Sequence, residues 1–211
     1  KKVGPNSDTR AIWYAEPGST TRKDFKVQAQ NGLGATELAW FTGQCKGMLQ
    51  CGNLTADNQT LVNRPETVVN WLRGQTQHAN DVILREYKVA EKEEVKTGSS
   101  ALPVVLGDVV SSKPAYLRGA RKSYTSTEYS EYKKAHADRD PTVFVAANDG
   151  MLHAFDAAGG EELWAYVPRI TMKKLPSQAG TGYKSKHQFT VDGSPELADV
   201  QIDGEWRTIL V

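Results

Sequence analysis

The stretch TVFVAANDGMLHAFDAAGGEELWAYV, residues 142–167, decides the fold. Three runs rich in β-branched and aromatic residues predict three short strands. The predicted strands are 142–147, 151–155 and 161–167. The segments between them, 148–150 and 156–160, hold the Asn, Asp and Gly residues that favour tight turns. Strands joined by such short turns pair antiparallel, so the stretch predicts a three-stranded meander.

A similar pattern recurs downstream, where three more strand-forming runs of residues predict strands. These are 188–191, 196–201 and 206–211, and Asp203-Gly204 predicts a hairpin turn between the last two. A phrase is also repeated, since GDVVSSKP at 107–114 and VDGSP at 191–195 each place a proline before a predicted strand. Recurring small antiparallel sheets are typical of a β-propeller. We therefore expect a mainly β fold, a partial β-propeller whose blades consist of antiparallel strands.

The last residue, Val211, falls inside the second strand of a predicted blade. A blade ending there would expose an apolar edge, which native proteins avoid. We therefore expect the chain to be cut short in mid-blade, and residues 1–211 to be the N-terminal part of one propeller domain.

The first hundred residues predict little regular structure. Residues 1–63 predict an irregular lead-in with short strands at 11–15 and 25–27, because closely spaced glycines keep residues 32–52 loop-like. Residues 64–100 predict a helix followed by a loop. Proline at the first helical position, Pro65, begins that helix, and Arg73-Gly74 ends it.

Residues 101–211 form the predicted blade region. Strands are expected at 104–106 and 115–117, followed by a helical insertion at 118–141. Thr125 and Glu128 fit a capping box at the start of the inserted helix. The insertion carries six basic residues in or near it. They are Lys113, Arg118, Arg121, Lys122, Lys133 and Lys134. A solvated surface explains them, and a partner-binding surface is the alternative, since loops of rigid scaffolds often carry contacts.

Composition excludes several classes of function. The 26 Lys and Arg residues nearly balance the 25 Asp and Glu residues, for a net charge of +1. That balance argues against a chain that coats nucleic acid or an anionic membrane. No apolar run approaches the roughly 20 residues that span a bilayer. The sequence contains no glycine-rich phosphate loop, nucleophile elbow or paired-carboxylate motif, so no catalytic residue is expected.

The two cysteines, Cys45 and Cys51, are separated by five residues. The pair fits a disulfide, two free thiols or, least well, part of a metal site, because zinc sites prefer shorter spacing and two further ligands. A disulfide would imply an oxidising compartment. The histidines lie in unrelated contexts, and His153, in mid-strand, is interpreted as a packed residue. We therefore expect no metal ligand in this segment, and we interpret Asn148-Asp149-Gly150 as turn chemistry.

Residues 154–164 resemble the tryptophan-docking repeat of quinoprotein-like propellers, approximately A-x-D-x-x-T-G-x-x-x-W. Ala154, Asp156, Gly160 and Trp164 match it, and glycine replaces the threonine. The resemblance implies that Asp156 accepts backbone N–H groups in the turn. It also implies that Gly160 adopts an unusual dihedral angle and that Trp164 packs between blades.

Residues 143–168 resemble more specifically a hallmark segment of the PilC/PilY-type proteins, which are associated with the tips of type IV pili. Four further phrases support this, in the expected order. They are VVNWLRGQ at 68–75, LGDVVSSKPAYL at 106–117, TVDGSPELADV at 190–200 and EWRTILV at 205–211. The resemblance is good over residues 64–211 and poor over the first sixty residues. It implies that the chain holds the start of the family's C-terminal β-propeller domain.

This resemblance implies a non-enzymatic scaffold, exported to the periplasm, outer membrane or pilus tip. The implied roles are pilus (fimbrium) biogenesis, cell adhesion and twitching motility. The implied partners are pilins and surface or host receptors. The alternatives are a fragment of a quinoprotein-like dehydrogenase and a generic envelope-assembly propeller. The family's calcium loop, of the form D-x-[DN]-x-D, is absent here because residue 142 is threonine after Asp138 and Asp140. Calcium, if bound, is expected downstream of Val211.

Overall fold

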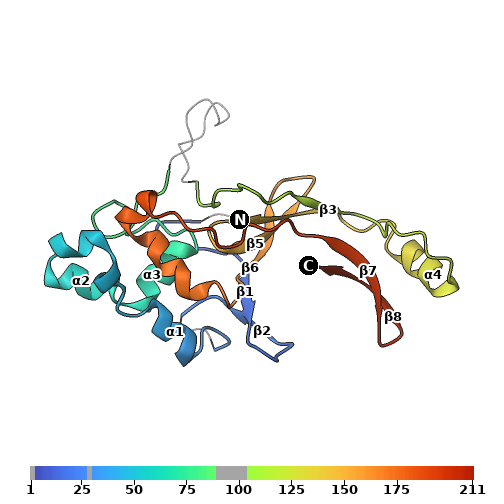
Figure 1. The fold of residues 1–211 in the computed structure, drawn as a ribbon, viewed down its shortest axis with the longest axis horizontal. Helices are drawn as coiled ribbons and strands as arrows, with labels where there is room; N and C mark the ends of the chain where they lie inside the picture. Colours follow the sequence, from blue (N-terminus) through green and yellow to red (C-terminus); the bar gives the residue numbers. More distant parts are fainter. Residues whose placement is uncertain (1–2, 28–29, 89–103) are drawn as a thin grey trace.

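The computed structural model describes residues 3–27, 30–88 and 104–211. Its main feature is a six-stranded sheet with the order β2-β1-β6-β5-β4-β3. The strands are β1 (Ile12–Ala15), β2 (Arg22–Asp24), β3 (Ala115–Leu117), β4 (Thr142–Ala147), β5 (Met151–Asp156) and β6 (Glu162–Tyr166). Figure 1 shows helices packed on one side of this sheet and a separate hairpin on the other.

Strands β3 to β6 form one antiparallel meander, as predicted from residues 142–167. Ala147 pairs with Met151 across the first turn, and Ala154 pairs with Trp164 across the second. Gly150 closes the first turn with a φ of +91°, which favours glycine. A side chain there would also collide with Leu175, since an added Cβ would lie 2.2 Å from its Cδ2. The meander is a four-stranded propeller blade.

Strand β1 extends this blade from the N-terminal region. It pairs in parallel with β6, and the backbone N–H groups of Ala165 and Val167 donate to the carbonyls of Ala11 and Trp13 at 2.9 Å each. Strand β2 then pairs antiparallel with β1 as the sheet edge. The charged residues of β2 suit an edge strand, because charge discourages pairing with other chains.

The second sheet is a hairpin of β7 (Leu197–Ile202) and β8 (Glu205–Leu210). Asp203 and Gly204 both have positive φ angles, 52° and 82°, as a two-residue hairpin turn requires. This confirms the turn predicted there. The sheets of the described residues do not close into a ring, which is consistent with a partial propeller and confirms the predicted fold class.

Helices cover one face of the main sheet. They are α1 (Ala35–Phe41), α2 (Ala56–Val62) and α3 (Pro65–Leu72), with the 3₁₀ helices η1 (Gln44–Gly47), η2 (Leu49–Asn53), η3 (Met172–Ala179) and η4 (Thr181–Ser185). Buried Ile12, Met151 and Val167 from the sheet share one apolar core with Val68 of α3 and Leu175 of η3. The N-terminal region and the first blade therefore share a single core.

The prediction that residues 32–52 form a loop is wrong. Helix α1 and both 3₁₀ helices η1 and η2 occupy it, because burial of Phe41 and Cys51 in the core stabilises short helices that their own propensity would not. Helix α2 was also missed, although Thr55 caps it by accepting a hydrogen bond from the N–H of Asn58.

Three predicted strands are also wrong. Residues 25–27 follow β2 as bends, because pairing of Arg22 with Ala15 places the strand earlier. Residues 104–106 form no ladder, and the N–H of Val104 donates to the carbonyl of Lys88 instead. Residues 188–191 are irregular, because the N–H of Thr190 donates to the Asn148 side chain.

Helix α3 agrees with the prediction, with Pro65 at its first turn and Arg73 as its C-cap. The inserted helix is α4 (Thr127–Ala135), but its cap is Ser126, whose hydroxyl accepts from the N–H of Tyr129. The proposed capping box therefore begins one residue too early. Residues 89–100 of the predicted loop lie outside the described residues. Among the described residues, no helix is long and apolar enough to cross a membrane.

Candidate functional site

The predicted docking motif lies in the β5–β6 hairpin. Ala154 is fully buried and pairs with Trp164 on the neighbouring strand. The Asp156 carboxylate accepts a hydrogen bond from the N–H of Gly159. Gly160 has a φ of +73°, which favours glycine. The turn thus has the geometry that the resemblance implies for Asp156 and Gly160.

Trp164 stacks on a residue of the N-terminal region. Its ring lies 5.1 Å from the ring of Trp13 in β1, at an angle of 25°, and 5.7 Å from Phe144 in β4. Arg22 of β2 covers the other ring of the pair, 4.4 Å from the centroid of Trp13. Among the described residues, then, Trp164 joins β1 to the blade, and its packing against a neighbouring blade stays a prediction.

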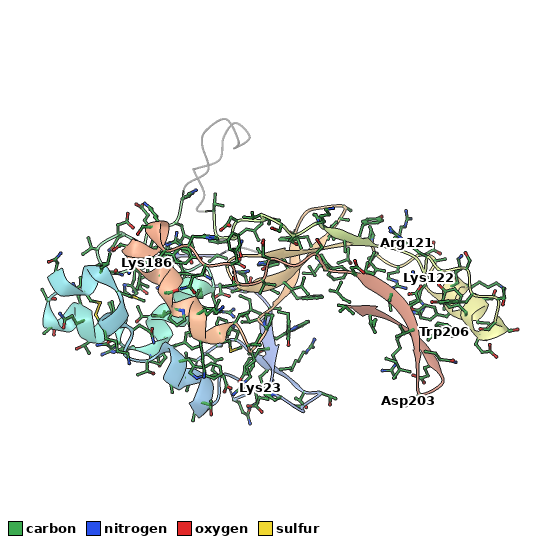
Figure 2. All side chains as sticks on the ribbon, in the orientation of Figure 1. Lys23, Arg121, Lys122, Lys186, Asp203 and Trp206 are labelled. Atoms are coloured by element: carbon green, nitrogen blue, oxygen red, sulfur yellow. A yellow bond between two sulfur atoms is a disulfide. The ribbon has the colours of Figure 1, made fainter. Side chains whose placement is uncertain are left out.

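Helix α4 attaches the β7–β8 hairpin to the rest of the molecule. The hydroxyl of Tyr129 donates to Asp199 of β7 at 2.7 Å and accepts from the N–H of Lys122 at 2.9 Å. Thr208 of β8 donates to the same carboxylate at 2.7 Å, and the Trp206 ring packs edge-on against Tyr129. Burial, followed by the bond to Asp199, raises the pKa of Tyr129 to about 12. Figure 2 shows Trp206 and Lys122 at this junction.

The basic residues of the insertion are all exposed. They are Lys113, Arg118, Arg121, Lys122, Lys133 and Lys134. Arg121 lies 5.5 Å from the ring of Tyr116. Lys133 and Lys134 lie in the last turn of α4, where positive charge complements the helix dipole. Helix stabilisation therefore accounts for two of the six, and the partner-binding role stays a prediction.

The two copies of the repeated phrase lie side by side. The backbone N–H of Ser111 donates to the Asp192 carboxylate at 3.1 Å, and the N–H of Lys113 donates to the Ser194 hydroxyl at 2.9 Å. When the prolines of the two copies are aligned, each bond joins matching positions. The repeat therefore forms one of the contacts between the first blade and the start of the second.

Cys45 and Cys51 form a disulfide in the structure, with 5.4 Å between their Cα atoms. The bond joins η1 to η2, and Cys51 is buried in the core. The loop of chain that the disulfide closes is short, so the chain-entropy model predicts that the bond stabilises the fold by about 2 kcal/mol.

A buried network of charges links the N-terminal region to the blade, and sequence reasoning missed it. We call it the buried charge network. It consists of Asp8, Arg10, Arg73, Asp149, His153 and Glu162. Arg10 donates twice to the Glu162 carboxylate, from Nε and Nη2, at 2.7 Å each. Arg73 pairs with Asp8 and also donates to the carbonyls of Phe25 and Arg10.

His153 lies at the centre of this network. Its Nδ1 contacts Glu162 at 2.8 Å and its Nε2 contacts Asp149 at 3.0 Å, and the ring is fully buried. Burial opposes a charge on the ring, but the charge of Asp149 and the two hydrogen bonds outweigh it and raise the pKa of His153 to about 9. Burial would also raise the pKa of Glu162, yet Arg10 and His153 lower it to about 2.

With His153 protonated, three cations face three carboxylates, and the network is neutral. Its hydrogen bonds join Arg10 and Asp8 of the N-terminal region to Glu162 of the blade and to Arg73 at the end of α3. Interpreting His153 as a packed histidine was incomplete, because the residue is also charged. Its alternation with buried Met151 was the signal that it points inward. No local motif marks Asp8, Arg10 or Glu162 as its partners. In the described part of the chain, no group of three or more His, Cys, Asp or Glu side chains is placed to hold a metal ion.

Comparison with known proteins identifies relatives along the chain. Residues 106–211 match the family model of the PilY1 β-propeller domain. The chain is 36% identical over 214 residues to the type IV pilus biogenesis factor PilY1 of Pseudomonas aeruginosa strain PAO1, a match covering 96% of this chain and 17% of the relative. It is 36% identical over 215 residues to a PilY1 homolog of Xylella fastidiosa, covering 98% of this chain and 14% of the relative.

The chain spans about a sixth of the length of these relatives. No solved structure matches it. The matched region begins just before the repeated phrase and includes the complete meander and the docking motif. The chain therefore belongs to the PilY1 family, and its second half is part of that family's β-propeller domain.

Proposed function

We propose that this chain serves type IV pilus biogenesis as a non-enzymatic scaffold. The observation that carries the proposal is the match of residues 106–211 to the PilY1 β-propeller domain, over a segment that folds as one blade and the start of a second. The buried polar groups support it, because the buried charge network holds the N-terminal region and the blade together.

We further propose that the protein is exported to the outer envelope or the pilus tip. The disulfide between Cys45 and Cys51 supports an oxidising compartment. There the blades would present their loops to pilus subunits and to receptors on other surfaces, and the exposed insertion at 118–141 is the proposed contact region. The relatives named as pilus biogenesis factors support the pilus-associated location.

The domain arrangement is part of this proposal. Residues 1–211 would form the N-terminal part of one propeller domain, although the family match begins only at residue 106. Support comes from β1, which pairs with β6, and from the core that Ile12 shares with Met151 and Val167. The N-terminal region would then be required for the first blade to fold.

A deletion in the native bacterium tests the pilus role. Loss of the gene should abolish or strongly reduce surface pili, measured by shearing and immunoblotting, and should reduce twitching zones. Complementation with Trp164→Ala should restore less piliation than complementation with the exposed neighbour variant Glu161→Gln. Normal piliation and twitching after deletion would contradict the proposal. Stoichiometric binding of pyrroloquinoline quinone with dye-linked alcohol oxidation by the purified protein would contradict the non-enzymatic role.

A further inference from the structure

An arginine lies between aromatic rings beside the first blade, away from the docking motif. The guanidinium carbon of Arg85 lies 5.0 Å from the ring centroid of Trp71 and 5.3 Å from that of Tyr183. Trp71 in turn stacks on Tyr87, with 4.8 Å between centroids and 9° between planes. Helix α3, the loop after it and η4 thus build one layered stack around a cation.

Hydrogen bonds hold this stack in place. The indole N–H of Trp71 donates to the carbonyl of Arg85 at 2.8 Å, and the Tyr87 hydroxyl donates to the carbonyl of Trp71. Arg85 Nε donates to the carbonyl of Gln178 at 2.7 Å. The guanidinium therefore has a defined plane and direction. Binding a ligand would not require the entropy cost of ordering this side chain.

The terminal nitrogens of Arg85 have no hydrogen-bond partner among the described residues. Within residues 3–27, 30–88 and 104–211, Nη1 and Nη2 donate to no side chain or carbonyl, and Arg85 forms no ion pair. Burial lowers the pKa of Arg85, and the electrostatic attraction of Asp81 and Asp108 offsets this effect only in part. This side chain is half-buried, and none of the described carboxylates forms the ion pair that buried arginines usually have.

These nitrogens belong to a groove of about 880 Å³, which we call the Arg85 groove. Its apolar wall includes Leu72, Val104 and Leu106, the last two partly exposed. The volume is within the range of sites that hold a small ligand or a few peptide residues.

The groove also contains four acidic residues, and none of them forms an ion pair with Arg85. Asp108 contacts His187 at 3.1 Å, and Asp149 contacts His153. Asp81 accepts a hydrogen bond from the backbone N–H of Glu86, whose side chain is exposed. The groove also contains the exposed residues Lys88 and Lys184, which form no ion pair with other described residues. Arg85 is thus a third cation of the groove that forms no ion pair with another described residue.

We propose that the Arg85 groove binds a carboxylate-bearing peptide segment of a protein partner, with an acidic side chain held by Arg85 and an apolar neighbour against Leu72 and Leu106. A guanidinium fork matches a carboxylate in a bidentate geometry, which adds direction as well as strength. A stacked arginine keeps that fork planar, so lysine is a poor substitute. The proposal does not depend on the pilus role.

Selection from a random peptide library displayed on phage, with the purified full-length protein as target, tests the proposal. Selected peptides should be enriched in Asp or Glu next to an apolar residue. The best peptide, measured by fluorescence polarisation, should bind roughly tenfold more weakly or worse when its acidic residue is changed to the amide. That comparison leaves the protein unaltered, so misfolding of a variant does not affect it.

Variants of the protein provide a second test of the proposal. Arg85→Gln and Arg85→Lys should each weaken peptide binding, the lysine variant despite keeping the charge. Arg22→Gln is the matched control, because it also removes an arginine from above a tryptophan ring, outside the groove. Unchanged binding by both Arg85 variants, selection without acidic enrichment, or no selected peptide would each overturn the proposal.

The chain itself offers a competing carboxylate source, since Glu91, Glu93 and Glu94 follow Lys88 in the sequence. A variant with all three changed to glutamine should bind the selected peptide as the natural chain does. Binding that appears only in this variant would assign the site to the chain's own carboxylates and would exclude the external partner.

Discussion

Glu162→Gln tests the buried charge network most sharply. The substitution keeps the size of the side chain and removes one negative charge. It leaves Arg10 and His153, both buried, facing a neutral amide, while Asp149 remains on the far side of the imidazole. Removing one partner of a buried ion pair is strongly destabilising because the remaining charge has been dehydrated without compensation.

The magnitude follows from the pKa of Glu162. The network lowers it from an ordinary 4.5 to about 2, and the side chain is only 12% exposed, so solvent screening is small. A shift of that size corresponds to about 3 kcal/mol of folding free energy at neutral pH. The raised pKa of His153 reflects partly the same interactions and is not added. We expect Glu162→Gln to lower the free energy of unfolding by about 3 kcal/mol.

The loss should depend on pH in a defined way. Because the pKa of Glu162 is lowered, its contribution is complete above 4.5 and disappears as the pH falls toward 2. Because the pKa of His153 is raised, its contribution is complete below 6.5 and disappears as the pH rises through about 9. The difference between natural and variant proteins should therefore be largest from pH 4.5 to 6.5.

Denaturant titrations across this pH range measure the difference. Glu161→Gln is the matched control, since its side chain is exposed and should change stability by less than about 0.5 kcal/mol. A Glu162→Gln variant that loses under about 1 kcal/mol at pH 6, or a loss that is independent of pH, would refute the reasoning.

Three further substitutions have defined outcomes. Trp164→Ala should cost about 2 kcal/mol in denaturant titration, below the range for a fully buried tryptophan because the residue is not fully buried; an unchanged midpoint would mean that the stacked pair does not form. Cys45 and Cys51 should resist alkylation before reduction, as read by mass spectrometry, and their joint replacement by alanine should cost about 2 kcal/mol; rapid labelling of both would contradict the disulfide. Tyr129→Phe should cost about 1–2 kcal/mol because buried Asp199 loses a donor, and a neutral result would mean that water replaces the hydroxyl.

The sequence was informative where its signals are local. The meander over residues 142–167 has alternating apolar residues and turn residues at short range, and its strand β4 has the predicted bounds. The hairpin turn at Asp203-Gly204 and the start of α3 at Pro65 depend on the backbone preferences of single residues. Such features need no knowledge of the rest of the fold.

The features that sequence reasoning missed are long-range. Strand β2 is charged and was not predicted, because its pairing with β1 decides its position. Helix α1 has no side-chain cap, and burial of Phe41 stabilises it. In the buried charge network, Arg10 and Glu162 are separated by 152 residues, and no spacing rule relates them.

The central claim is that the N-terminal region extends the sheet of the first blade, and amide hydrogen exchange tests it most directly. The N–H groups of Ala165 and Val167 point away from β5 and donate to β1. If β1 pairs with β6, these two amides should exchange as slowly as those that join β4 to β5. Exchange as fast as that of an unpaired edge strand would contradict the claim.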